Sequence, residues 1–144
     1  MWKFENYNST FKKLLFMRND KPNIIVDKTI DFSLSIIKYC EVLENQKKYI
    51  IARQLLRSAT SIGANVFEAQ NAESKVDFIH KMKIAAKEAS EVSYWLILCE
   101  RSEGYSFQNK YREDLDQIIK IISKIISSAK GKIPGFIWSM LFAF

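Results

Sequence analysis

The sequence predicts an all-α fold, an antiparallel up-and-down four-helix bundle, on two observations. Four stretches repeat apolar residues at intervals of three and four positions, which is the periodicity of an amphipathic helix. Short polar breaks separate them, and the 144 residues include only four Gly and two Pro, too few for a turn-rich β-sandwich. Because helices joined by short turns pack antiparallel, we expect one bundle over residues 24–130, an N-terminal extension at 1–23 and a tail at 131–144.

The first two helices are predicted over 24–43 and 46–69. The first follows the break at Pro22, and Asn23 or Asp27 is placed to cap its first turn. Its apolar positions, which we expect to face the core, are Ile30, Leu34, Ile37, Cys40, Val42 and Leu43. In the second helix the corresponding positions are Ile51, Ala52, Leu55, Ala59, Ile62, Val66 and Ala69.

The third and fourth helices are predicted over 75–103 and 109–129. Ser74 and Asp77 resemble a capping box ahead of the third helix, and Gly104 marks its end. Its expected core positions are Phe78, Met82, Ala85, Ala89, Val92, Leu96 and Cys99. The fourth helix is rich in isoleucine, but its length and spacing favour a helix over a strand. Its expected core positions are Leu115, Ile118, Ile119, Ile122, Ile125, Ile126 and Ala129.

The run at 57–69 is the most informative part of the chain, because a helical pattern there is built from small and polar residues. Glycine in a helix interior costs about 1 kcal/mol relative to alanine, so Gly63 indicates that another element comes close. Ala59 and Gly63 share one helix face, and we expect it to pack against the alanine-rich patch at 85–89. Tight core packing and a polar ligand site at a helix crossing both fit this pattern.

Positive charge exceeds negative charge, with 22 Lys and Arg against 16 Asp and Glu and a formal net charge of +6. Residues 117–144 contain four lysines and no acid, and residues 45–71 contain four cations against Glu68 alone. Concentrated positive charge is typical of proteins that bind nucleic acid or another polyanion. A basic surface that is merely solvated is the simpler alternative. The side chains that we expect to contact phosphates are Lys47, Lys48, Arg53, Lys120 and Lys124.

No pattern for catalysis, a cofactor or a metal is present in the sequence, so we expect no enzyme. His80 is the only histidine and has no partner for a metal site or a catalytic triad, which places it on the surface. The four glycines are scattered and form no phosphate-binding loop. Cys40 and Cys99 lack metal-ligand spacing, and we expect two buried, reduced thiols of a cytoplasmic protein.

The end of the chain, residues 133–144, is almost wholly apolar. Because a monomer does not leave such a surface in water, we expect packing on the bundle or on a neighbouring subunit. Contact with a membrane interface and an unfolded segment are the alternatives. The segment is too short to span a bilayer, no apolar run reaches the ~18 residues that a span needs, and the first residues do not form a secretory signal.

Four segments together resemble the 23S rRNA intervening-sequence proteins, a family encoded within insertions in bacterial ribosomal RNA genes and elsewhere. They are residues 54–69 (QLLRSATSIGANVFEA), 74–82 (SKVDFIHKM), 85–89 (AAKEA) and 94–96 (YWL). The resemblance covers about residues 24–130. It implies a four-helix bundle assembled into a homo-oligomer, pentameric in characterised members, that binds RNA or DNA without strong sequence preference.

The same resemblance identifies a polar motif, which we expect to organise the contact between the second and third helices or a subunit interface. Its members are Arg57, Ser61, Gly63, Asn65 and Glu68. Glu68 and Glu73 are expected to form structural ion pairs with Arg57 or Lys75. The related accessory protein of diversity-generating retroelements implies a second function class, a scaffold that contacts a reverse transcriptase or another protein. An interfacial membrane protein is a third class, which depends only on the apolar tail.

Overall fold

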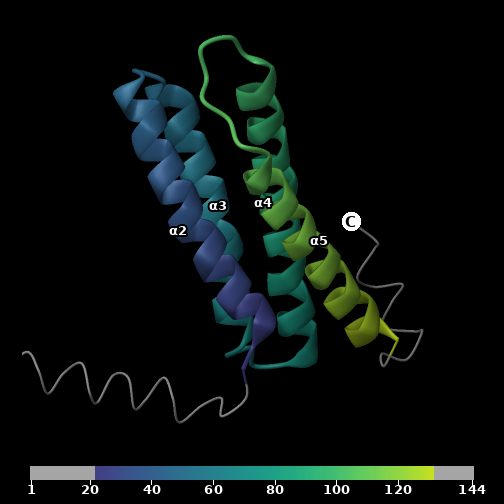
Figure 1. The fold of residues 1–144 in the computed structure, drawn as a ribbon. Coiled ribbons are helices and arrows are strands. Elements are labelled where there is room, and N and C mark those ends of the chain that lie inside the picture. The colour runs from purple at the N-terminus through teal and green to yellow at the C-terminus, as the bar shows by residue number, and fades with distance from the viewer. Residues whose placement is uncertain (1–21, 132–144) are drawn as a thin grey trace, which may run out of the picture.

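The computed structural model describes residues 22–131, which form four α-helices and no strand (Figure 1). The helices are α2 (Ile24–Asn45), α3 (Tyr49–Ala69), α4 (Lys75–Arg101) and α5 (Asn109–Lys130). Helices consecutive in the chain pack against each other, and α5 returns to α2. The predicted all-α bundle is therefore confirmed over this part of the chain. Nearly all of the predicted tail and of the N-terminal extension lies outside the described residues.

Two helix starts differ locally from the expectation. The second helix begins at Tyr49 rather than at residue 46, because Lys47 takes a positive φ of 60° that interrupts the helix. Asn23 does not cap α2; its Nδ2 instead donates to Oε1 of Gln70 at 2.7 Å and ties the start of α2 to the end of α3. The predicted cap of α4 is confirmed, since Oγ of Ser74 accepts from the N–H of Asp77.

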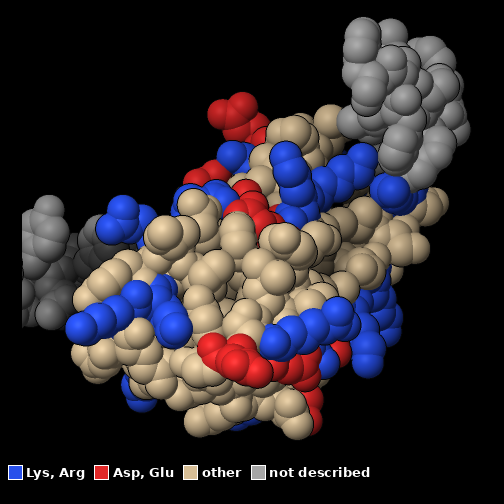
Figure 2. Space-filling view, turned by 90° about the horizontal axis from the view of Figure 1, so that it is seen from above, with Lys and Arg blue, Asp and Glu red and all other residues tan. Residues whose placement is uncertain are grey.

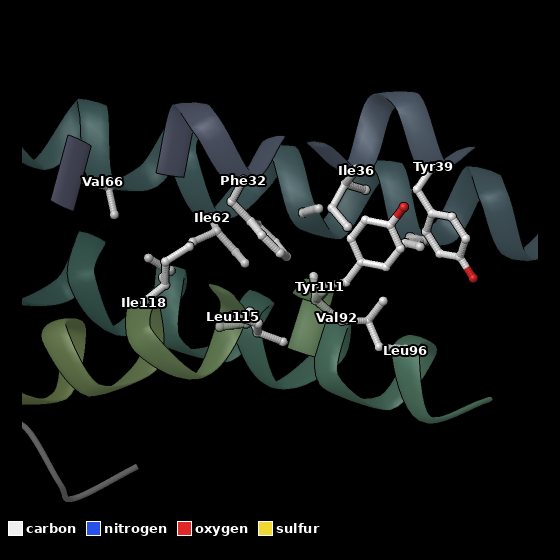
Figure 3. Close-up of a cluster of buried hydrophobic side chains, with 14 of the residues drawn as sticks. Phe32, Ile36, Tyr39, Ile62, Val66, Val92, Leu96, Tyr111, Leu115 and Ile118 are labelled. Atoms are coloured by element: carbon white, nitrogen blue, oxygen red, sulfur yellow. The ribbon is translucent and has the colours of Figure 1, made fainter. Parts of the chain in front are cut away.

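The predicted buried face of α2 was wrong over most of its length. Ile30, Leu34 and Ile37 are 47%, 54% and 38% exposed, and only Cys40 and Leu43 of the expected set are buried; Val42 is exposed as well. The residues that fill the core instead are Ile25, Thr29, Phe32, Ile36, Tyr39, Cys40 and Leu43 (Figure 3). Both stripes have helical spacing, and the stripe with Phe32 and Tyr39 offers more apolar area to bury.

The expected core faces of α3 and α4 are confirmed. On α3 the buried set contains every predicted position except the half-buried Ile51. On α4 only Phe78 differs, since it is half-buried and its neighbour Ile79 is buried. On α5 the buried residues are Tyr111, Leu115, Ile118 and Ile122, while the predicted Ile119, Ile125 and Ile126 are partly buried against the core. Figure 3 shows side chains of all four helices meeting in this core.

Gly63 packs against α2 and not against the alanines of α4, which corrects the expected contact. A Cβ atom placed on Gly63 would lie 3.4 Å from Oγ of Ser33 and 3.6 Å from Cβ and the carbonyl oxygen of Thr29. Those are ordinary van der Waals distances. The site therefore has room for a methyl group and for little more, and it holds α3 close to α2 (Figure 1).

Two substitutions at Gly63 should distinguish the cost of glycine in a helix from the close approach of α2 that its small size permits. Gly63→Ala should raise the free energy of unfolding by up to about 1 kcal/mol, because the methyl group fits and alanine favours the helix. Gly63→Leu should lower it by about 1–3 kcal/mol by forcing α2 away. Urea denaturation measures both, and Ala64→Leu, at the exposed next position of α3, is the matched control. Equal stability of the two leucine variants would contradict this packing.

A cluster of tyrosines and thiols fills the core near the α2–α3 turn. The rings of Tyr39 and Tyr111 stack with centroids 4.4 Å apart. Sγ of Cys40 donates to the carbonyl oxygen of Ala52 at 3.3 Å, and Cys40 and Cys99 are both free and buried, as expected. Burial raises the pKa of Cys40 to about 12 and raises the pKa of Tyr39 and Cys99 as well. These thiols are therefore protonated and inert in the folded protein.

The raised pKa of Cys40 makes the folded state less stable in alkali. An unfolded thiol loses its proton above pH 9, its ordinary value, whereas the folded thiol keeps it up to about pH 12. Over this window the unfolded state binds fewer protons, so the free energy of unfolding falls by up to about 1.4 kcal/mol per pH unit. Urea denaturation from pH 8 to pH 11 should show this slope, and Cys40→Ala should reduce it. An unchanged slope in that variant would refute the assignment.

Candidate nucleic-acid interface and the α3–α4 polar seam

The five lysines and arginines predicted to contact phosphates lie in two separate groups. Lys47 and Lys48 are in the turn between α2 and α3, and Arg53 is near the start of α3, all at one end of the bundle, whereas α5 runs away from that end (Figure 1). With a rise of 1.5 Å per residue, Lys120 lies ~16 Å along α5 and Lys124 ~22 Å along it. A single chain therefore does not gather these residues into one patch.

The first group is partly engaged with the protein itself. Nζ of Lys48 lies 4.7 Å from the centroid of the Tyr105 ring, a cation–π contact with the loop between α4 and α5. Nε2 of Gln46 donates to Oγ of Ser106 at 2.7 Å and fixes the turn to the same loop. Lys47 and Arg53 are exposed. Seen from this end, lysines and arginines are separated, with acidic side chains between them (Figure 2).

The second group lies in the part of α5 that carries no acid. From Gln117 to Gly131 the chain has three lysines and no Asp or Glu. Lys120 and Lys124 are exposed, and neither side chain forms an ion pair or hydrogen bond within residues 22–131. Nearby, Nζ of Lys28 on α2 donates to Oε1 of Gln117 at 2.7 Å. Lys120 and Lys124 therefore present positive charge that no ion pair offsets within residues 22–131, and Asp116, one turn before Lys120, is the nearest acid along the helix.

The described helices carry only a small part of the net charge. Residues 22–131 contain 16 of the 22 Lys and Arg residues and 14 of the 16 Asp and Glu residues, so they account for +2 of the formal +6. The remainder belongs to 1–21 and to Lys132. Local arrangement, and not overall charge, must decide where the bundle attracts an anion.

Ion pairs across the outside of α3 and α4 form what we call the α3–α4 polar seam. Arg57 of α3 is hydrogen-bonded to the carboxylate of Glu91, and its Nη1 lies 3.8 Å from Oε2 of Glu88. Nζ of Lys81 donates to Oε2 of Glu68 at 2.6 Å. The expectation that Glu68 pairs with Arg57 or Lys75 was therefore wrong, because each α3 side chain faces a partner on α4.

The remaining members of the predicted polar motif do not form an open site. Nδ2 of Asn65 donates to the carbonyl oxygen of Ser61 at 2.9 Å and to its Oγ at 3.3 Å, so both residues are satisfied within α3. The hydroxyls of Ser58 and Thr60 donate to carbonyl oxygens one turn back. Together with the contact of Gly63 with α2, these bonds favour tight core packing, and not a ligand site, as the role of residues 57–69.

The sequence did not predict that Trp95 belongs to the α3–α4 polar seam. Its Nε1 donates to Oε1 of Glu91 at 3.2 Å, one helical turn away, while the side chain packs on the core. This bond and then the Arg57 guanidinium lower the pKa of Glu91 below its ordinary value. The spacing of four residues between Glu91 and Trp95 was the available signal. The neighbouring Tyr94 is 56% exposed, and His80 is exposed as expected.

The fold and its surface define a charged, all-helical bundle without a metal centre in residues 22–131. No group of three or more His, Cys, Asp or Glu side chains there is placed to hold a metal ion. None of the helices in this range is both long and apolar enough to cross a bilayer. What the surface offers a partner is therefore a set of exposed cations, the α3–α4 polar seam and exposed apolar side chains.

Comparison with known proteins identifies the family. The sequence profile of the 23S rRNA-intervening sequence proteins matches residues 21–128, and the chain belongs to this family. It is similar to the crystal structure of a protein with unknown function from the S23 ribosomal protein family of Bacteroides thetaiotaomicron VPI-5482. The two chains are 40% identical with a TM-score of 0.66, over 71% of this chain and 97% of that one. No curated protein matches the chain.

The geometry of the seam predicts a specific energetic coupling. A double-mutant cycle of Arg57→Ala and Glu91→Ala should give a coupling energy of about 0.2–1 kcal/mol, the range of exposed ion pairs. This coupling should vanish as pH falls through the lowered pKa of Glu91, since protonation removes its charge. The cycle of Arg57→Ala and Glu68→Ala is the control and should give none. Coupling in the control cycle alone would contradict the structure.

Proposed function

We propose that the chain is a non-enzymatic, oligomeric accessory protein that binds RNA or DNA through the phosphate backbone. The observation that carries this proposal is the acid-free half of α5, where Lys120 and Lys124 are exposed one turn apart. Lysine contacts to phosphates supply affinity without reading sequence, so we expect little sequence preference. The resemblance to the 23S rRNA-intervening sequence proteins, which implies nucleic-acid binding, adds support.

Assembly into a homo-oligomer, pentameric by family resemblance, is part of the proposal. Two lysines on a bundle of charge +2 give a weak site, and repeating that site around an assembly raises the effective concentration of the second and later contacts. Native mass spectrometry measures the subunit number. Buried free thiols at Cys40 and Cys99 support a reducing compartment, which for this protein we take to be the cytoplasm.

Fluorescence anisotropy with labelled structured RNA and duplex DNA, across a salt series, tests binding directly. We expect micromolar or tighter affinity at low salt and a linear fall of log affinity with log salt concentration. Comparison of the two ligands identifies the preferred nucleic acid. Absence of binding to both ligands at low salt would overturn the proposal.

Charge reversal on α5 should weaken that binding more than an equal change elsewhere. K120E/K124E should lower affinity at least about tenfold and reduce the salt slope for duplex DNA by about 1.8, two contacts at ~0.9 each. The matched control is K38E/R101E, which alters net charge equally at exposed positions on α2 and α4. Equal losses in the two variants would mean that net charge alone acts, and would refute the α5 assignment.

A protein-interaction scaffold is the second candidate, with a reverse transcriptase as one possible partner by resemblance. The small charge of the bundle and its exposed apolar side chains favour this function. Coexpression with a reverse transcriptase encoded beside the gene, followed by copurification, tests it. Copurification without any nucleic-acid affinity would support the scaffold over the first proposal.

A further inference from the structure

The outer side of α2 carries an apolar stripe that the bundle does not cover. We define the α2 outer stripe as Ile30, Leu34 and Ile37, which follow one another at intervals of four and three residues and are each more than a third exposed. Ile24, at the start of the same helix, is 62% exposed. Adjacent large apolar side chains on one helix face indicate a surface that is buried against something else.

Acidic side chains flank this stripe without partners in the bundle. Asp27, Asp31, Glu41 and Glu44 are all exposed, and none forms an ion pair with another residue of 22–131. Of the two lysines on α2, Lys28 is bonded to Gln117, and Lys38 is exposed beside the stripe, so four acids and one free-standing lysine border it. The α2 outer stripe is therefore an apolar surface with an acidic border, which fits an occupant that is apolar and basic.

The segment Met1–Lys21 has that chemistry and joins α2 directly. It contains five Lys and Arg against two acids, and Phe4, Tyr7, Phe11 and Leu14 recur at intervals of three and four residues. The family match begins only at residue 21, so this segment is an addition to the shared bundle. Its net charge of +3 is half of the +6 of the chain.

The length of the segment is sufficient for it to reach the whole stripe. Ile37 lies 13 residues after the start of α2, ~20 Å along its axis at 1.5 Å per residue. Twenty-one residues span ~31 Å as a helix and more if extended. Because the segment is tethered at the start of α2, its effective concentration at the stripe is in the millimolar range, so even a weak contact would be occupied.

We propose that Met1–Lys21 of the same chain covers the α2 outer stripe, with its apolar side chains on Ile30, Leu34 and Ile37 and its cations near the acidic border. This inference does not rest on the proposed nucleic-acid binding. It also means that the charge of this segment is largely neutralised within the molecule.

Thiol reactivity in the full-length chain tests the proposal, because the native thiols are buried and protonated. In the L34C variant the introduced thiol should react with Ellman's reagent slowly, and adding F11S/L14S should speed the reaction at least about tenfold. The control reporter is Y94C on α4, which F11S/L14S should not affect. Equal rates for L34C with and without F11S/L14S would overturn the proposal.

Two further readouts identify the occupant. Protection of the L34C thiol should not depend on protein concentration; protection that grows with concentration would mean that a second copy covers the stripe, and would also overturn the proposal. Trypsin should cut after Lys12, Lys13 and Arg18 several-fold faster in L34S/I37S than in the unchanged chain, as judged by mass spectrometry. Unchanged cleavage rates would contradict a contact between residues 1–21 and the α2 outer stripe.

Discussion

Small side chains along α3 determine how closely its neighbours pack, and the rest of the bundle depends on that spacing. Ala59 is fully buried, Ser58 is buried with its hydroxyl bonded inside the helix, and Gly63 brings Thr29 of α2 within van der Waals distance. Because α3 lies between α2 and α4, a bulky residue such as leucine on either face would displace a neighbouring helix. The backbone-directed hydrogen bonds of its Ser, Thr and Asn side chains let α3 keep these small polar residues without leaving donors unpaired.

How much of this arrangement the sequence could reveal differs from helix to helix. On α3 and α4 a single stripe of apolar residues exists, so its period alone identifies the buried face. On α2 two stripes share the same period, one through Leu34 and one through Ile36, and only the packing against other helices selects between them. The ion-pair partners were missed for a related reason. The pairing of Glu68 with Lys81 depends on the register between helices, which spacing within one helix does not encode.

The sequence could predict which cations are exposed, but not where the two groups of cations lie relative to each other in the fold. Clustering along the chain identified cations around residues 47–53 and 120–124, and four of the five predicted side chains are exposed. Antiparallel topology then puts the two clusters at different levels of the bundle, and Lys48 lies over the ring of Tyr105. Neither the cation–π contact nor the acids that separate the cations at that end could be derived from local sequence, because both come from elements distant in the chain.

Charge balance links the two proposals. The bundle alone carries +2, and the segment 1–21 adds +3, so polyanion binding could reside on either part. If that segment lies along the acidic border of α2, its cations are already paired at short range, where a nearby opposite charge outweighs screened attraction to a distant phosphate. Lys120 and Lys124 then remain as exposed cations that form no ion pair within residues 22–131; Asp116, one turn before Lys120, is the nearest acid along α5. Repetition of that pair in an assembly, and not the net charge of one chain, would supply the affinity for nucleic acid.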